Sequence, residues 1–304
     1  MQEDIFDFDS ELKAKTKYIE NVMKLYLPKE EGFQENIIKA MNYSVFAPGK
    51  RIRPMLMKET YELLAYDNTY NYQALEIFMV AIELLHAYSL VHDDLPALDN
   101  DELRRGIPTT HVKYGEAAAI LAGDGILNYA YELVAKAFEV GADTQCIIKS
   151  FKILSEKAGI YGMLGGQAVD VETAGMVNDV KKLNFIYELK TGAFIEASMM
   201  IGAILAGVND ETVEKVKNIA SDIGLAFQIQ DDILDVTSTT DVLGKPVNSD
   251  EKNEKSTYVT LHGIDISKEY VGFYSERALQ GIKELDGYNK FLNELVIRLV
   301  KREK

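Results

Sequence analysis

The sequence contains a single cysteine, Cys146, among its 304 residues. One cysteine cannot form a disulfide within the chain, and it cannot build a cage of thiolate ligands around zinc. The stability of the fold must therefore come from a buried core. A hydrophobic content of 47% in a chain of this length can supply a large one.

Basic residues are in the minority, because 33 lysines and arginines stand against 48 acidic residues and give a formal net charge of −15. An acidic chain is a poor match for the phosphate backbone of a nucleic acid, so we expect no nucleic-acid partner. A small phosphorylated ligand stays compatible with this charge. Divalent cations bound to carboxylates, together with a few local basic side chains, can hold such a ligand.

The sequence also lacks a secretory signal and a convincing membrane span. The N-terminal stretch MQEDIFDFDS is acidic and has no apolar segment behind a basic one. The two most apolar stretches, FMVAIELLHAYSLV and FIEASMMIGAILAGV, are short for a span or carry Glu83, His86 and Glu196. We therefore expect a cytoplasmic protein without a membrane span.

Alternating patterns typical of β-strands are missing as well. Apolar residues instead recur at three- and four-residue spacings in stretches such as ELKAKTKYIENVMKLYL and ETVEKVKNIASDIGLAFQIQDDILD. Turn-forming segments such as FAPGKRIRP and GMLGGQ separate these stretches, and no linker divides the chain. The sequence predicts an all-α fold of roughly ten or more helices, in one domain over residues 1–304.

Two aspartate clusters occupy awkward places in this helical pattern. One lies in VHDDLPALDNDELRRG, which begins at Val91, and the other in FQIQDDILD, which begins at Phe227. A single run of carboxylates more often marks a solvated helix face. Both clusters, however, follow apolar helical runs, where carboxylates near a helix C-terminus oppose its dipole by roughly 0.3–1 kcal/mol. Something must offset this cost in both places.

A bound cation is the natural partner for the two clusters. Helical spacing pairs Gln228 with Asp231 and Asp232, and Asp231 with Asp235, so one stripe presents an amide and two or three carboxylates. In the first cluster Pro96 stops the helix, so a short turn can fold Asp99 back toward the preceding carboxylates. Oxygen ligands without His or Cys at metal spacing favour Mg²⁺, with Mn²⁺ as a substitute, over Zn²⁺, and the spacing is not that of a calcium-binding loop.

Basic residues accompany the carboxylates. Lys50, Arg51 and Arg53 lie in APGKRIRP, and Arg104 and Arg105 follow the first aspartate cluster. The guanidinium group can bind phosphate oxygens bidentately. Any one of these residues alone would be interpreted as an ordinary surface charge. Their occurrence together with two aspartate clusters predicts a phosphate-binding site.

An ordered set of motifs identifies a family. From about Met41 through Thr260 the chain carries GKRIRP, LLHAYSLVHDDLPALDNDELRRGIPTTH, LAGD, GGQAVD, LKTG, FQIQDDILD and LGKPVNSDEKNEKSTYV. In this order and spacing the chain resembles the trans-polyprenyl diphosphate synthases, and most of all the bacterial farnesyl diphosphate synthases. The resemblance implies a homodimeric enzyme with an isoprenoid-synthase-type helical bundle around a deep central cavity. The chain departs from the family at Asn100 and Glu102, where aspartates are frequent.

The resemblance implies a role for each matching position. The magnesium ligands would be the aspartates of the two clusters, Asp93, Asp94, Asp99, Asp231, Asp232 and Asp235. Contacts to isopentenyl diphosphate would come from Lys50, Arg53, His86 and Arg105. Contacts to the allylic diphosphate would come from Arg104, Lys190, Lys245 and Lys255. Beside the reacting carbon and along the same cavity would lie Thr191, Gln228, Gln167 and Asp170.

The implied reaction is a condensation of isopentenyl diphosphate with dimethylallyl or geranyl diphosphate. Magnesium and basic side chains would stabilise the departing diphosphate, and the double bond of isopentenyl diphosphate would attack the allylic carbon. Tyr88 lies five residues before Asp93, about 7.5 Å deeper along the helix, where its ring would close the cavity. The neighbouring Ser89 is small. An aromatic residue at position 88, with the two-residue expansion inside the first motif, resembles the farnesyl-making bacterial-type members of the family. The resemblance therefore implies farnesyl diphosphate as the product, with a geranylgeranyl product as the near alternative.

Three more distant interpretations remain at this point. A terpene cyclase or an all-α Mg²⁺ pyrophosphatase also uses acidic helices, but a cyclase does not need GKRIRP, and a nucleotide pyrophosphatase leaves a long apolar cavity unexplained. A non-catalytic partner subunit would be marked by a damaged aspartate motif. Both motifs are intact in this sequence.

Overall fold

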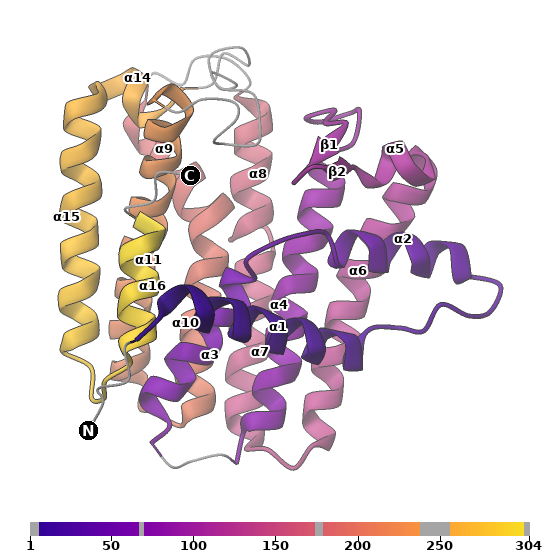
Figure 1. Ribbon diagram of the computed structural model, residues 1–304, viewed down its shortest axis with the longest axis horizontal. Coiled ribbons are helices and arrows are strands. Elements are labelled where there is room, and N and C mark those ends of the chain that lie inside the picture. The colour runs from indigo at the N-terminus through magenta and orange to yellow at the C-terminus, as the bar shows by residue number, and fades with distance from the viewer. Residues whose placement is uncertain (1–5, 67–69, 174–178, 238–255, 301–304) are drawn as a thin grey trace.

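The computed structural model describes residues 6–66, 70–173, 179–237 and 256–300, and helices dominate it (Figure 1). The α-helices are α1 (Phe8–Tyr26), α2 (Glu35–Val45), α3 (Ile52–Leu64), α4 (Tyr72–Asp93), α5 (Thr110–Tyr114), α6 (Glu116–Lys136), α7 (Thr144–Ala158), α8 (Met163–Glu172), α9 (Val180–Ile186), α10 (Ala193–Ala206), α11 (Asp210–Thr237), α14 (Tyr258–His262), α15 (Ile264–Lys283) and α16 (Lys290–Val300). Two shorter helical pieces are η1 (Ala137–Glu139) and the π-helical turn η2 (Tyr187–Gly192). The all-α prediction is confirmed.

A small hairpin was not predicted from the sequence. Strand β1 (Leu103–Arg104) pairs antiparallel with β2 (Ile107–Pro108). The two connecting residues, Arg105 and Gly106, have φ of 53° and 80°, as a tight hairpin turn with two left-handed residues requires. Strands of two residues are too short to show a period of two in the sequence. The hairpin fixes both Arg104 and Arg105 just after the first aspartate cluster.

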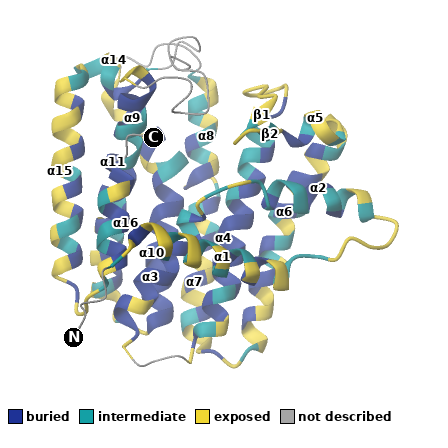
Figure 2. Cartoon of the chain, in the orientation of Figure 1, coloured by how far each residue is buried: buried dark blue, intermediate teal, exposed yellow. Residues whose placement is uncertain are grey.

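Helix α4 lies in the middle of the bundle and is buried on nearly every side. It packs mainly against α3, α6 and α10, and its contacts with α1, α2 and α7 are less extensive. In Figure 2, α3, α4 and α10 are dark blue over most of their length, whereas α15 alternates between buried and exposed residues. This burial explains the near-continuous apolar sequence of α4, because a helix surrounded by others has no polar face.

Two helical segments are long and apolar enough to cross a membrane, Tyr72–Asp93 with 22 residues and Val180–Ala206 with 27. Their most apolar windows are 78% and 83% buried inside the protein. Both helical segments are longer than the apolar stretches seen in the sequence, so their length alone does not distinguish them from membrane spans. The burial of their apolar windows inside the protein is typical of core helices in a folded bundle.

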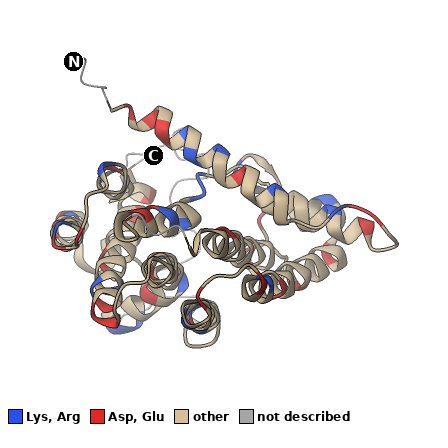
Figure 3. Cartoon of the chain, turned by 90° about the horizontal axis from the view of Figure 1, so that it is seen from below, with Lys and Arg blue, Asp and Glu red and all other residues tan. Residues whose placement is uncertain are grey.

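Helix α1 runs across the other helices along one side of the bundle (Figures 1 and 3). Asp7 caps its N-terminus by accepting hydrogen bonds from two backbone amides of the first turn. Phe8 at its start stacks on Phe291 of α16, with ring centroids 4.9 Å apart. The first and last described helices therefore pack on one another and share the main hydrophobic core.

The C-terminal ends of α4 and α11 lie at the same end of the bundle, near the hairpin and α14 (Figure 1). Helix α4 ends at Asp93, as the sequence predicts. Helix α11 continues to Thr237, so its aspartates occupy the last two turns. The fold thus brings the two acidic clusters, which are about 140 residues apart in sequence, to one end of the molecule.

Candidate active site

The first aspartate cluster forms a compact turn at the end of α4. The backbone amide of Asp99 donates to the carbonyl oxygen of Asp93 at 2.9 Å, which is the fold-back that the sequence predicts. Asn100 follows with a left-handed φ of 52°. The carboxylate of Asp94 accepts from Arg104 Nε at 2.6 Å, and its Oδ1 lies 2.5 Å from Arg104 Nη2. The hairpin therefore carries a cation directly onto the cluster.

The carboxylates of this cluster are held in an unfavourable environment. Burial, together with the nearby charges of Asp99 and Asp94, raises the pKa of Asp93 to about 6, although Lys190 and Arg104 oppose the shift. Burial also raises the pKa of Asp94, against the effect of its hydrogen bond to Arg104. Gathering carboxylates in this way costs stability unless a cation joins them.

A second group of charges, the α4 pocket, lies beside the acidic turn. It consists of Arg51, Arg53, Glu83, His86 and Arg105. Burial, and then the charges of the surrounding arginines, hold the pKa of His86 well below its ordinary value, so its imidazole is neutral. Burial, with a smaller contribution from the charge of Arg105, lowers the pKa of Arg53 to about 10 against the opposing effect of Glu83. The pocket is therefore rich in positive charge that the protein does not fully balance.

The sequence interpretation treated Lys50, Arg51 and Arg53 as one basic group, but the structure gives the three side chains different environments. Arg51 is 4% exposed and has a left-handed φ of 51°. Its Nη1 lies 2.9 Å from Glu83 Oε1, and its Nη2 donates to the carbonyl oxygen of Ala47 at 3.0 Å. Lys50 is exposed, and Arg53 is half-buried with an Nε that has no hydrogen-bond partner. Arg51 holds the loop, while Arg53 keeps hydrogen-bonding capacity for a ligand.

The loop before α3 is held from the other side by the hairpin. Arg105, which is also left-handed at φ 53°, donates from Nη1 to the carbonyl oxygen of Pro48 at 2.9 Å. A Cβ atom on Gly49 would lie 2.4 Å from that same Nη1, so any other residue there would force the guanidinium to move. The pocket between these elements is lined by Arg51, His86, Asp94, Arg104 and Arg105, among others.

A row of side chains on α8 and η2 connects the two aspartate clusters. Gln167 Nε2 donates to Asp93 Oδ1 at 2.6 Å, and its own Oε1 is buried without a partner. Lys190 Nζ donates to Asp170 Oδ2 at 2.6 Å. A Cβ on Gly166 would lie 2.3 Å from the backbone nitrogen of Lys190, so α8 and η2 can approach closely only with glycine there. Gln167, Asp170 and Lys190 thus lie together beside the first aspartate cluster.

Lys190 and Thr191 belong to the π-helical turn η2. Such turns are rare, and they occur frequently at functional sites. Burial lowers the pKa of Lys190, but Asp170 and Asp93 outweigh this and raise it, so the ammonium stays charged. Thr191 Oγ1 donates to Gln228 Oε1 on α11 at 2.8 Å. The wider turn places both residues between the first and the second aspartate cluster.

The second aspartate cluster is more deeply packed than the first. Asp232 and Asp235 are 3% and 2% exposed, and Asp231 is half-buried. Asp232 Oδ2 accepts from the hydroxyl of Tyr187 at 2.6 Å and from the backbone amide of Tyr258 at 2.8 Å. The sequence interpretation missed these two tyrosines. Tyr258 stands in the motif STYV that follows Lys255, but its amide contact crosses 26 residues and leaves no local pattern.

The structure also reveals the role of Glu83, which the sequence interpretation treated only as an interruption of an apolar run. Glu83 is 4% exposed and is the nearer of two ion-pair partners of Arg51, at 2.9 Å against 3.5 Å for Glu20. It lies three residues before His86 on α4, so the two side chains occupy one face of the helix. That spacing is the signal that could have found it.

At the predicted floor of the cavity Tyr88 is buried and Ser89 is half-buried. Tyr88 is 6% exposed, and its ring meets His92 edge-on with centroids 6.0 Å apart. Burial, followed by Tyr131 and Asp93, raises the pKa of Tyr88 to about 12. The hydroxyl of Ser89 donates to the carbonyl oxygen of His86 at 2.9 Å. The predicted ligands Lys245 and Lys255 lie outside the described residues.

The carboxylates of the two clusters are donors of the kind that a divalent cation binds. In residues 6–66, 70–173, 179–237 and 256–300, no group of three or more His, Cys, Asp or Glu side chains converges closely enough to hold an ion by itself. The chemistry of the donors nevertheless fits Mg²⁺, because both clusters offer carboxylate oxygens and the raised pKa of Asp93 marks uncompensated negative charge. Mg²⁺ usually takes only one or two carboxylates and completes its shell with phosphate oxygens and water.

The fold and site together define an all-α protein that sets a cationic pocket and two acidic clusters at one end of a helical bundle. Residues 34–284 match the family model described as polyprenyl synthetase, and the chain belongs to this family. It is 38% identical over 275 residues to the farnesyl diphosphate synthase of Geobacillus stearothermophilus, which covers 90% of this chain and 91% of that relative.

Two solved structures resemble the whole chain. A geranyltransferase from Helicobacter pylori, complexed with magnesium and isoprenyl diphosphate, has a TM-score of 0.83 and 32% identity, and the match covers 98% of each chain. A geranylgeranyl pyrophosphate synthetase from Pyrococcus horikoshii has a TM-score of 0.86 and 28% identity, with 97% of this chain and 98% of that chain covered. The predicted family and fold class are confirmed.

Proposed function

We propose that this chain is a trans-prenyltransferase that condenses isopentenyl diphosphate with dimethylallyl and geranyl diphosphates, releasing farnesyl diphosphate and diphosphate. One observation carries the proposal. Helix α4 presents His86 to an incompletely balanced cationic pocket and, two turns later, presents Asp93 to an acidic cluster. Two adjacent sites of opposite charge suit two diphosphates that bind differently, one directly to cations and one through metal ions.

Isopentenyl diphosphate would occupy the α4 pocket. Arg53, Arg105 and the exposed Lys50 supply positive charge to its diphosphate, and the neutral imidazole of His86 can donate one hydrogen bond. The lowered pKa values of Arg53 and Arg105 support this assignment, because burial and neighbouring arginines destabilise their charge in the free protein. A bound diphosphate would relieve that repulsion.

The allylic diphosphate would bind between the two aspartate clusters. Asp93, Asp94 and Asp99 of the first cluster, with Asp231 and Asp235 of the second, would hold Mg²⁺, for which Mn²⁺ can substitute. When bound, the cation supplies charge neutralisation for the departing diphosphate. Arg104 and Lys190 add positive charge at the same place, and Lys245 and Lys255 are proposed as further contacts.

The protein's own residues would control the bond-forming step. The C–O bond of the allylic diphosphate breaks and its electron pair leaves with the diphosphate, while the double bond of isopentenyl diphosphate forms the new C–C bond. The Thr191 hydroxyl and Gln228 carbonyl, already hydrogen-bonded to each other, present dipoles to the positive carbon. The new C–C bond leaves a positive carbon on the former isopentenyl unit, which then loses a proton to form the double bond of the product. The released diphosphate can accept that proton, so no protein nucleophile is required.

The first experiment incubates the purified protein with labelled isopentenyl diphosphate, dimethylallyl diphosphate and Mg²⁺, with and without a chelator, and measures product chain length. A chelator-sensitive C15 product is the expected result. A C20 product would support the proposed condensation reaction but would change the proposed product to geranylgeranyl diphosphate. A product formed without isopentenyl diphosphate would favour a cyclase. Absence of elongation in every condition would favour a non-catalytic partner subunit and overturn the proposal.

Tyr88 is proposed as the residue that stops elongation. Its buried ring lies toward the interior from the acidic cluster along α4, and truncation would open space for a longer chain. Tyr88→Ala is expected to shift the main product from C15 to C20 or longer. Ser89→Ala is the matched control, because it removes only a hydroxyl that bonds the backbone at His86. An unchanged C15 product in Tyr88→Ala would place the floor elsewhere.

A cytoplasmic homodimer is proposed as the working form. On α6 and α7 four large apolar side chains are exposed, namely Ile120, Leu121, Ile148 and Phe151. Phe151 also meets Tyr131 edge-on, with centroids 6.1 Å apart, so the two helices contribute to one surface. A second copy would cover this apolar surface. Sedimentation of the wild type and of Phe151→Glu would test this, with a shift to monomer expected in the variant.

A further inference from the structure

The carboxylate of Asp232 has protein partners that differ from those of a typical metal ligand. It is 3% exposed, and one of its oxygens, Oδ2, accepts both the Tyr187 hydroxyl at 2.6 Å and the Tyr258 amide at 2.8 Å. Two donors on one oxygen stabilise the charge of the carboxylate within the protein itself. By contrast, Asp93 accepts one hydrogen bond from Gln167 and keeps a raised pKa.

These two hydrogen bonds join three elements that meet at Asp232. Tyr187 is the first residue of η2, Tyr258 is the first residue of α14, and Asp232 belongs to α11. The two tyrosine rings stack with centroids 5.7 Å apart, and the hydroxyl of Tyr258 donates to Asn184 on α9. A capping box between Thr257 and Thr260 fixes the start of α14.

The connection matters because η2 needs external support. A π-helical turn is rare and occurs mostly as a single turn inside an α-helix, so its position depends on the contacts around it. Lys190 and Thr191, three and four residues after Tyr187, are anchored by Asp170 and Gln228. The Tyr187 hydroxyl anchors the beginning of the turn to α11. Together these bonds determine where the Lys190 ammonium and the Thr191 hydroxyl lie.

We infer that Asp232 is a positioning residue rather than a metal ligand. With Tyr187 and the backbone of Tyr258 it forms a latch, which fixes η2 so that Lys190 and Thr191 face the allylic substrate. The inference rests on the proposed function in one respect, the identity of the substrate that Lys190 and Thr191 contact. The α4 pocket shares no described residue with the latch, so the two diphosphate sites should respond differently to its loss.

The test compares Asp232→Asn with Asp232→Ala. An asparagine carbonyl can still accept both hydrogen bonds, whereas a ligand role needs the negative charge. For a latch, Asp232→Asn keeps kcat and the half-saturating Mg²⁺ concentration within a few-fold of the wild type, while Asp232→Ala lowers kcat by about tenfold or more without changing KM for isopentenyl diphosphate. Equal loss in both variants, with a raised Mg²⁺ requirement, would overturn the inference.

A second measurement does not depend on turnover. Hydrogen exchange at the Tyr258 amide is expected to speed up in Asp232→Ala and to stay slow in Asp232→Asn. Tyr187→Phe should lower kcat by a few-fold, and Tyr274→Phe is its control, since it removes a hydroxyl from the same aromatic cluster without a contact to Asp232. Unchanged exchange in Asp232→Ala would refute the latch. Inactive wild-type protein would instead refute the proposed function and leave the exchange result valid.

Discussion

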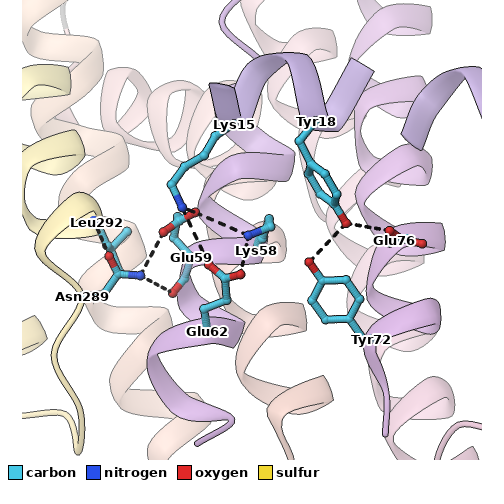
Figure 4. A network of polar contacts seen from close by, with 9 residues as sticks. All are labelled: Lys15, Tyr18, Lys58, Glu59, Glu62, Tyr72, Glu76, Asn289 and Leu292. Carbon is cyan, nitrogen blue, oxygen red and sulfur yellow. Dashed lines mark hydrogen bonds and ion pairs between the residues drawn. The ribbon is translucent and has the colours of Figure 1, made fainter. Parts of the chain in front are cut away.

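Two partly buried groups of charges in this molecule differ in how far their members balance one another. In the α1–α3 network, defined by Lys15, Lys58, Glu59, Glu62 and Asn289, two lysines meet two glutamates (Figure 4). Lys15 Nζ lies 2.7 Å from Glu59 Oε1, Lys58 pairs with Glu62, and Asn289 Nδ2 donates to Glu59 Oε2 at 2.9 Å. In the α4 pocket, three guanidinium groups meet one carboxylate of the pocket, Glu83, and Arg51 Nη2 also lies 3.5 Å from Glu20 Oε1 on α1.

The difference indicates which region is built for stability and which for binding. A buried charge costs several kcal/mol unless it is paired. In the α1–α3 network, ion pairs and hydrogen bonds between its own members offset that cost and connect α1, α3 and the residue before α16. The α4 pocket leaves it partly unmet, since the Nε atoms of Arg51 and Arg53 are buried without partners. A diphosphate would supply the missing negative charge, which is why we place substrate there.

The largest expected effect is on the balanced network. Glu59→Gln leaves Lys15 and Lys58 beside one exposed glutamate, and breaking a buried pair in this way should lower the free energy of unfolding by about 3 kcal/mol. Urea unfolding checks the value. Glu62→Gln is the matched control, because Glu62 is partly exposed and its loss should cost under about 1 kcal/mol. Both variants should keep the kcat of the wild type. Similar losses in the two would show that burial does not set this energy.

The reverse outcome is expected in the α4 pocket. Arg53→Gln removes a charge that the protein does not balance, so the free energy of unfolding should stay the same or rise. The loss of a charged contact to diphosphate should lower kcat/KM for isopentenyl diphosphate on the order of 100-fold, mostly through KM. Steady-state kinetics with each substrate varied in turn would measure this. A matching loss for the allylic substrate would argue against two separate diphosphate sites.

Much of this comparison is hidden from the sequence, and the reason is sequence separation. The end of α4 at Asp93 and the turn back to Asp99 depend on residues within one or two helical turns, so local patterns predict them. The ion pair of Arg51 with Glu83 joins residues 32 positions apart. The bond between Tyr187 and Asp232 spans 45 positions. Such contacts form only when the helices pack, and no rule based on residue spacing predicts them.

The helical content was predictable for the same reason, whereas two local departures were not. A 3.6-residue period is visible over the long stretch of α11, but β1 and β2 have two residues each. The π-helical turn η2 continues the apolar pattern of α9 and α10, so the sequence around Lys190 reads as ordinary helix. What distinguishes it is its set of long-range partners, Asp170, Gln228 and Asp232. The membership of the site followed from the family motifs, and its geometry required the structure.

The acidic cluster offers a third test of the comparison, of intermediate size. Because the folded-state pKa of Asp93 is raised to about 6, the folded protein holds this proton more tightly than the unfolded chain. The contribution of Asp93 to stability is therefore greatest below its ordinary pKa and is lost as the pH rises through about 6. Asp93→Asn should raise the free energy of unfolding by about 1–2 kcal/mol at pH 7.5 without divalent cations, and abolish most turnover.

Thermal and urea unfolding of both proteins in a chelating buffer would measure the gain across pH. The difference should stay nearly constant well above the folded-state pKa of about 6. It should shrink as the pH falls through that value toward pH 4.5, because the wild-type carboxyl becomes neutral over that range. Asp210→Asn serves as a control, since that carboxylate is exposed at the N-terminus of α11 and far from the cluster in sequence. A gain that is constant with pH would mean that the carboxylate charge is not its source.

The smallest effect is expected from a hydroxyl beside the α1–α3 network. Tyr18 on α1 donates to Glu76 Oε1 at 2.6 Å and lies 3.1 Å from the hydroxyl of Tyr72, both on α4 (Figure 4). Tyr18→Phe keeps the ring and removes both hydrogen bonds, so it should lower the free energy of unfolding by about 1 kcal/mol. Kinetic constants for both substrates should not change, because these bonds join α1 to the first turns of α4 and not to the end that carries Asp93. A change in product length or KM in this variant would show that the packing of α1 reaches the substrate pocket, and the separation between a region for stability and a region for binding would then fail.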